Sequence, residues 1–185
     1  MINIMRLKDK YSKEILPQLR EKFSYKNNNL APKLTKVVVN VGFGRHHKEK
    51  ELIAAIGRSL EKITGQKPVF TVAKKSISAF KIRDGLVIGA KVTMRGQRMY
   101  DFVEKLVNIT FPLVRDFRGI SDKSVDRGGN LTVGFKEYNS FPEVRLSEAD
   151  QVFGLEICLA SSAKNREEGL ELFRLLGFPF KKDSK

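Results

Sequence analysis

The chain has 185 residues, of which 41% are hydrophobic and 30% are charged, a composition that supports a folded core and argues against disorder. Its 35 Lys and Arg residues outnumber the 21 Asp and Glu residues, and the resulting net charge of +14 indicates a polyanionic partner. The single cysteine excludes an internal disulfide framework and fits a reducing compartment, and we expect neither a secretory signal nor a membrane partner.

In chain order, the first expected element is a helix over residues 6–24, in which apolar residues recur every four positions and Pro17 introduces a kink or a break. A loop at 27–32 precedes a β-branched strand that ends at Gly42. The apolar stripe from Leu52 to Ile63 predicts a second helix with Gly65 at its C-cap. A short strand at 69–73, a protruding basic loop at 71–86 and a strand at 86–94 follow.

The second half of the chain begins with a helix whose apolar face runs from Met99 to Ile109. A polar, glycine-rich segment then leads to strands within 131–137 and 152–160. Asn165 and Glu168 predict a capping box at the start of a last helix, which ends at Gly177 before a frayed tail at 181–185. These elements predict an α+β fold: a single domain over 1–185, with a mainly antiparallel sheet, helices packed on one face and the other face open for RNA.

The signals for catalysis and metal binding are weak. Gly42 and Gly44 begin a glycine pattern, but His47 stands where a dinucleotide-binding loop would place its third glycine. His46 and His47 are adjacent, so they cannot share a face of a regular element. A nucleophile elbow is also absent from the sequence. We therefore expect a binding protein that is not an enzyme and uses no cofactor or metal.

The region from Gln66 to Arg98 is basic, with Asp84 as its only acid, and such a segment suits the phosphates of a nucleic acid. Its cations are Lys67, Lys74, Lys75, Lys81, Arg83, Lys91, Arg95 and Arg98. Ile77, Phe80 and Ile82 stand among these cations, which favours a grip on phosphate combined with contact to unstacked bases or riboses. The alternative is that these apolar side chains fold back into the core, with Ile82 the best candidate.

Two of the expected strands carry polar residues on one face. Lys91, Thr93 and Arg95 alternate along one strand and therefore point to the same side. Asn40 shares its side of the other strand with Lys36, between valines that point the opposite way. The Asn40 amide either makes a hydrogen bond within the sheet or meets RNA on an open face, and both interpretations remain open.

A long set of motifs resembles the bacterial-type family of large-subunit ribosomal protein five. The motifs are "KVVVNVGFG", "ITGQKPVFTVAKKSISAFKIRDGLVIGAKVTMRGQRMYDF", "RDFRGIS", "FPE" and "LLGFPF". The likeness extends in order over nearly the whole chain. It implies an α+β protein that binds 5S ribosomal RNA in the central protuberance of the large subunit, beside 23S ribosomal RNA and neighbouring proteins. It also implies contacts with peptidyl-site transfer RNA and, through an intersubunit bridge, with small-subunit ribosomal protein thirteen.

The resemblance carries over to particular residues. Asn40, Gln66, Thr93 and Arg95 match the family's 5S RNA contacts, and Lys36, Lys67 and Lys91 extend that set. The loop "AKKSISAFKIR" resembles the segment that the family directs toward transfer RNA, which comprises Lys74, Lys75, Ser76, Ile77, Ser78, Phe80, Lys81 and Arg83 here. The resemblance also implies a surface that faces the intersubunit bridge, which we call the bridge side. It is assigned more coarsely, to Arg115, Arg118, Lys123 and Arg127.

Some residues depart from the family pattern. Arg127 stands one position early in the segment 126–130, and Tyr138 and Ser140 replace the usual Gln and Ile. Gly169 lies inside the last helix, where helix propensity favours Ala by up to about 1 kcal/mol. Two other classes of function stay open: an RNA- or phosphate-processing enzyme, and a non-ribosomal regulator of messenger RNA or DNA. We expect a cytoplasmic location in the large ribosomal subunit, and an organellar ribosome stays open as the alternative.

Overall fold

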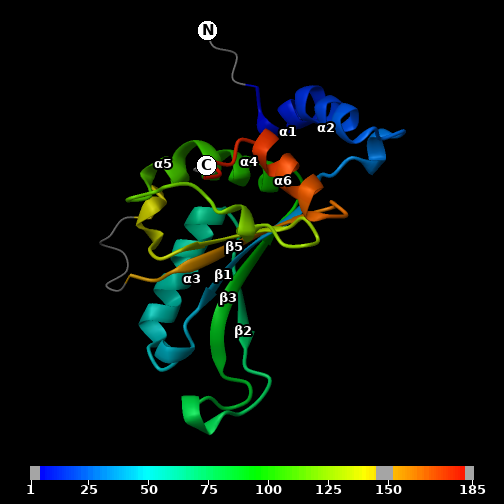
Figure 1. The fold of residues 1–185 in the computed structure, drawn as a ribbon. Coiled ribbons are helices and arrows are strands. Elements are labelled where there is room, and N and C mark those ends of the chain that lie inside the picture. Colours follow the sequence, from blue (N-terminus) through cyan, green and yellow to red (C-terminus); the bar gives the residue numbers. More distant parts are fainter. Residues whose placement is uncertain (1–4, 145–151, 182–185) are drawn as a thin grey trace. The chain divides into compact units, whose positions relative to one another are not determined.

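The computed structural model describes residues 5–144 and 152–181 (Figure 1). Its contacts divide the chain into two compact units. Unit 1 comprises Met1–Val37, Met94–Val133 and Cys158–Lys185, and unit 2 comprises Val38–Thr93 and Gly134–Ile157. No helix within the described residues is long and apolar enough to cross a lipid bilayer.

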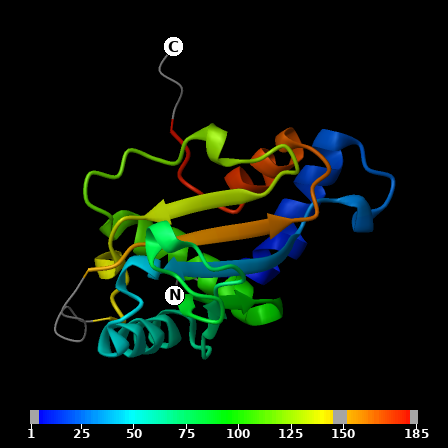
Figure 2. The ribbon, with the colours of Figure 1, turned by 90° about the horizontal axis from the view of Figure 1, so that it is seen from below.

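Five strands form one sheet in the order β2-β3-β1-β5-β4. Their bounds are β1 (Leu34–Gly42), β2 (Val69–Val72), β3 (Val87–Met94), β4 (Leu131–Phe135) and β5 (Leu155–Ser161). Strands β2 and β3 pair antiparallel. The arrows of β4 and β5 also point in opposite directions (Figure 2). The α+β class with an antiparallel sheet is therefore confirmed.

Unit 2 holds its segment of the sheet against helix α3 (Lys50–Thr64). Helix α3 buries Ile56, Leu60 and Ile63, as its apolar stripe predicts. The helix ends at Gly65, whose φ of +66° is the left-handed conformation that glycine adopts without a Cβ penalty. Gly57 also matters for packing, because a Cβ there would lie 3.1 Å from the Phe70 ring of β2.

The N-terminal helix of unit 1 is continuous but not uniform. It consists of α1 (Leu7–Lys10), a π-helical turn at Tyr11–Ile15 and α2 (Leu16–Phe23). Pro17 lies in the first turn of α2, directly after the π-helical turn. Because proline has no N–H to donate, the wider turn before it accommodates the missing hydrogen bond. The sequence predicted a kink or a break here, and the structure resolves it as this turn.

A second π-helical turn, Leu106–Thr110, links α4 (Gly96–Lys105) to α5 (Phe111–Leu113). One extra residue per turn rotates the side chains that follow it. Ile109 is consequently 45% exposed, while Thr110 is fully buried. The sequence placed Ile109 on the same face as Met99, and this assignment is wrong because a regular helical period was assumed.

Helix α6 (Arg166–Leu175) closes unit 1. The Asn165 side chain accepts a hydrogen bond from the Glu168 N–H at 2.9 Å, which confirms the predicted N-cap. A capping box would also have the Glu168 carboxylate accept from the N–H of Asn165. The carboxylate instead accepts from the N–H of Lys164, one residue earlier in the chain. Gly177, with φ +92°, follows the helix.

The structure also bears on two other predictions for unit 1, which concern position 169 and the C-terminal tail. Ala is not the better residue at position 169, because Gly129 lies directly against Gly169 and leaves no room for a Cβ. The Lys181 N–H donates to the Ile120 carbonyl at 2.9 Å, so the first residue of the expected frayed tail is held. Residues 182–185 of that tail lie outside the described residues.

Candidate nucleic-acid interface

Asn40 is the clearest polar feature of the sheet in unit 2. It is exposed, whereas its neighbours Val39 and Val41 are buried on the opposite face. Its side chain makes no hydrogen bond with another described residue. An amide in this position loses nothing by being exposed, and it keeps its donors and acceptor for a ligand. The interpretation of Asn40 as a structural hydrogen bond within the sheet is therefore not supported.

Gln66 and Thr93 lie together in the same unit. The Gln66 Nε2 donates to the Thr93 backbone carbonyl at 3.3 Å, and the Gln66 N–H donates to the Thr64 hydroxyl at 3.3 Å. Gln66 is thus held against β3 by its side chain and tied to the end of α3 by its backbone. Thr93 is half-buried on β3, two residues from exposed Lys91.

The remaining members of the predicted 5S RNA set are all exposed cations. Lys67 follows Gln66 in unit 2, whereas Lys36 and Arg95 belong to unit 1. Lys91 pairs in register with Val69 of the edge strand β2. Unit 2 alone therefore brings together Asn40, Gln66, Lys67, Lys91 and Thr93.

The loop at 71–86 continues from β2 and returns to β3 at one end of unit 2 (Figure 1). A short bridge joins Ile77 to Ile82, with a 3-10 turn (Ser78–Phe80) between them. Phe80 is 67% exposed and Ile77 is 46% exposed, while Ile82 is half-buried. The apolar residues thus divide: Ile82 braces the loop, and Phe80 and Ile77 lie on its surface.

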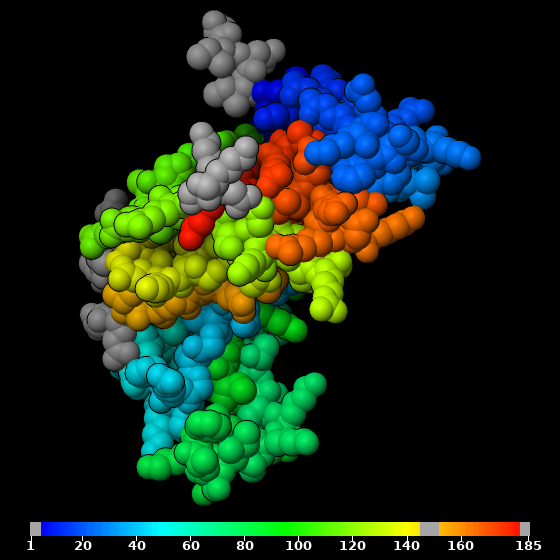
Figure 3. Space-filling view, in the orientation of Figure 1, coloured from blue at the N-terminus to red at the C-terminus, as the bar shows by residue number. Residues whose placement is uncertain are grey.

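The loop has a second basic side that the sequence did not reveal. A pocket of about 910 Å³ lies between it and the residues that precede α3. We call this the basic pocket; its cationic lining is Lys48, Lys50, Lys81 and Arg83, and the His47 imidazole also lines it. The run "HHKEK" at 46–50 was the available signal, but only the fold brings it to Lys81. Figure 3 shows the 44–50 turn directly beside the 71–86 loop.

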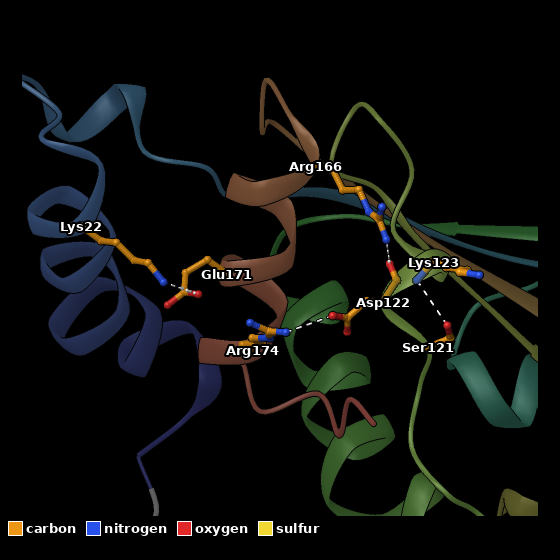
Figure 4. Close-up of polar contacts among 7 residues, drawn as sticks. All are labelled: Lys22, Ser121, Asp122, Lys123, Arg166, Glu171 and Arg174. Atoms are coloured by element: carbon orange, nitrogen blue, oxygen red, sulfur yellow. Dashed lines mark hydrogen bonds and ion pairs between the residues drawn. The ribbon is translucent and has the colours of Figure 1, made fainter. Parts of the chain in front are cut away.

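The predicted bridge side belongs to unit 1, where Arg115, Arg118, Lys123 and Arg127 are all exposed. Asp122 anchors this segment to α6 (Figure 4). Its carboxylate accepts from Arg174 at 3.1 Å, and its backbone carbonyl accepts from Arg166 at 2.7 Å. The Lys123 side chain points away from these contacts (Figure 4). Lys22 and Glu171 form a separate ion pair on the other side of α6, at 2.6 Å.

The turn around Arg127 is closed by Asp126 and Asn130. The Asp126 carboxylate accepts from the Asn130 N–H at 2.8 Å and from its side-chain amide at 2.9 Å. These hydrogen bonds hold the pKa of the Asp126 carboxyl below its ordinary value. Asp126 therefore stays ionised and holds the turn that carries exposed Arg127.

Comparison with known proteins gives a consistent result over both units. The family model described as "Ribosomal protein L5" matches residues 27–83, and the model for the C-terminus of the same ribosomal family matches residues 87–180. The large ribosomal subunit protein uL5 of Desulforamulus reducens is 51% identical, over 97% of this chain and 99% of its own length. The uL5 proteins of Halothermothrix orenii and Carboxydothermus hydrogenoformans are 50% and 49% identical, over 94% and 95% of this chain and 97% and 98% of their own lengths.

Proposed function

Because the chain belongs to the ribosomal protein L5 family and is a structural constituent of the large ribosomal subunit, we propose that it binds 5S ribosomal RNA and helps attach it in the central protuberance. The family consists of structural ribosomal proteins rather than enzymes. The subunit in which its bacterial members work is cytoplasmic.

Asn40 carries the proposal for 5S RNA. Its exposed amide has no partner among the described residues and lies on a strand whose alternate residues are buried, so it can donate to or accept from sugar and base edges. Lys91 and Lys67 would supply phosphate contacts in the same unit as Gln66 and Thr93. Lys36 and Arg95 would extend the contacts from unit 1.

Three further contacts complete the proposed role. The loop at 71–86 would meet peptidyl-site transfer RNA, with Lys74, Lys75, Lys81 and Arg83 on phosphates and Phe80 on unstacked bases or riboses. The exposed cations of unit 1 on the bridge side would face small-subunit ribosomal protein thirteen. The 23S ribosomal RNA and neighbouring proteins of the central protuberance would lie beside the bound 5S RNA.

A competition experiment tests the proposal. The affinity of the purified protein for 5S RNA is compared with that for an unrelated structured RNA of the same length, over a series of salt concentrations. We expect 5S RNA to bind more tightly at every salt concentration, with log affinity falling linearly against log salt. Equal affinity for the two RNAs would mean that the charge of +14 produces general RNA binding only.

A further inference from the structure

The basic pocket is built from two segments that are distant in sequence. The 44–50 turn supplies His47, Lys48 and Lys50, and the 71–86 loop supplies Lys81 and Arg83. The segments meet at Gly44, where an added Cβ would lie 3.8 Å from the Ile82 side chain. Both segments belong to unit 2.

The charge in the basic pocket is of one sign. None of its lining residues is acidic. Three acids adjoin its cations in the sequence: Glu49 places its carboxylate on His46 at 2.9 Å, and Glu51 and Asp84 do not line the pocket. Within the described part of the chain, Lys48, Lys50, Lys81 and Arg83 make no ion pair. Gathering unpaired cations costs stability, and an anion in the pocket would remove that cost.

The backbone around the pocket adds to the positive potential. Lys50 begins α3, a helix of 15 residues, and the first N–H groups of a helix lack intrahelical partners. His47 is fixed in place because its Nδ1 donates to the Gly44 carbonyl at 2.8 Å. Lys81 has φ +54°, a left-handed conformation that is uncommon for a residue other than glycine or asparagine. This conformation ends the 3-10 turn Ser78–Phe80 and fixes where the Lys81 side chain leaves the backbone.

We propose that the basic pocket binds one backbone phosphate of RNA together with its flanking riboses. A free phosphate would fill little of a pocket of about 910 Å³. The pocket is also lined by Ile82 and Leu86, which offer apolar contact to sugars, and by the hydroxyls of Ser76 and Ser78. The proposal rests on the proposed contact between the loop and transfer RNA. It assigns Lys81 and Arg83 to a site shared with the 44–50 turn, and it leaves Lys74 and Lys75 outside that site.

Matched double variants separate this site from general electrostatics. K81N/R83Q and K48Q/K50Q each remove two charges from the basic pocket, and Asn tolerates the left-handed conformation at position 81. K74Q/K75Q removes two charges from the same loop outside the pocket. The quadruple variant of the two pocket pairs completes a double-mutant cycle. Circular dichroism and thermal unfolding check the fold of each variant.

We expect each pocket pair to weaken the binding of transfer RNA about tenfold, which corresponds to one lost charge-assisted contact. The quadruple variant should weaken binding little further, because both pairs hold the same phosphate. K74Q/K75Q should have a smaller effect that adds to those of the other pairs. Strictly additive losses, equal for the pocket pairs and K74Q/K75Q, would overturn the proposal. Affinity for 5S RNA, measured in parallel, should not change.

A titration of the full chain with inorganic phosphate separates the pocket from the function of the loop. Amide NMR signals of residues 47–50 and 81–83 should shift saturably, and K81N/R83Q should abolish the shifts. If the wild-type protein fails to bind transfer RNA, the proposed role of the loop is wrong. The phosphate titration alone then tests whether the basic pocket binds an anion. A local, saturable response then supports the anion site. Shifts spread evenly over the basic surface would overturn it.

Discussion

Gly169 of α6 lies in backbone contact with Gly129, the glycine that closes the turn after Asp126. A Cβ on Gly169 would lie 2.5 Å from the Gly129 carbonyl oxygen and 2.8 Å from its carbonyl carbon. Gly129 itself has φ +74° and is buried. The two glycines therefore let the turn of the predicted bridge side approach the helix, and neither position accepts a side chain.

Gly169→Ala should destabilise the protein even though alanine is the better helix former. The gain in helix propensity is about 1 kcal/mol at most, whereas a Cβ forced onto rigid backbone atoms costs about 1–3 kcal/mol. Urea unfolding measures the difference. Gly134→Ala is the matched control, because nothing lies within 4 Å of the Cβ added there. A more stable Gly169→Ala variant would show that the turn can move away from α6.

Tyr11→Phe should lower the free energy of unfolding by about 1–3 kcal/mol at pH 8, because the variant leaves a buried carbonyl without its donor. The Tyr11 hydroxyl donates to the Pro32 carbonyl at 3.0 Å. Burial, with a smaller contribution from Tyr100, raises the pKa of Tyr11 from 10.0 to about 12. A folded-state pKa above the unfolded value gives stability that is present below pH 10 and is lost as the pH rises through about 12.

Unfolding experiments on both proteins across this alkaline range check the assignment. The difference in free energy of unfolding between the wild type and Tyr11→Phe should be constant up to pH 10 and should become smaller above it. A gap that does not change with pH would mean that the hydroxyl is not the group responsible.

Asn40→Ala and Thr93→Ala should each weaken binding of 5S RNA by about fivefold to tenfold, the value of one polar contact. Neither change should unfold the protein, because Asn40 is exposed and Thr93 is half-buried. Thr132→Ala serves as the control, because it removes an exposed hydroxyl from β4, outside the predicted contact set. If all three variants bind 5S RNA equally well, Asn40 and Thr93 are ordinary residues of the sheet.

The variant Lys74→Ala, Lys75→Ala and Lys81→Ala should spare 5S RNA binding and impair steps that depend on transfer RNA. All three lysines are exposed in the 71–86 loop, away from Asn40 in sequence. Filter binding with 5S RNA and with transfer RNA, at one salt concentration, gives the comparison. Loss of 5S RNA binding in this variant would show that the loop contacts 5S RNA rather than transfer RNA.

The sequence predicted most helices and strands because their apolar residues follow the helical and strand periods. It could not predict the π-helical turns, which insert one residue and expose Ile109. Gly169 was misjudged because helix propensity is local, whereas its contact with Gly129 joins residues 40 positions apart. The same limit hid the basic pocket, since the connection of His47 with Lys81 exists only in the folded chain.

For the candidate site, the sequence identified the residue types but not their environment. It left two interpretations for Asn40; the structure shows that this side chain is exposed, and its contact with RNA stays a prediction. It also left open whether Ile77, Phe80 and Ile82 contact RNA or fold back into the core. The structure divides them, because Ile82 is half-buried beside Gly44 while Phe80 is exposed.

The identity of the RNA that co-purifies with the native protein tests the central claim most directly. The protein would be isolated from dissociated large subunits at a salt concentration that removes loosely held RNA, and the bound RNA would be sequenced. We predict 5S ribosomal RNA in a one-to-one ratio with the protein. RNA fragments in proportion to their cellular abundance, with no enrichment of 5S RNA, would contradict the account.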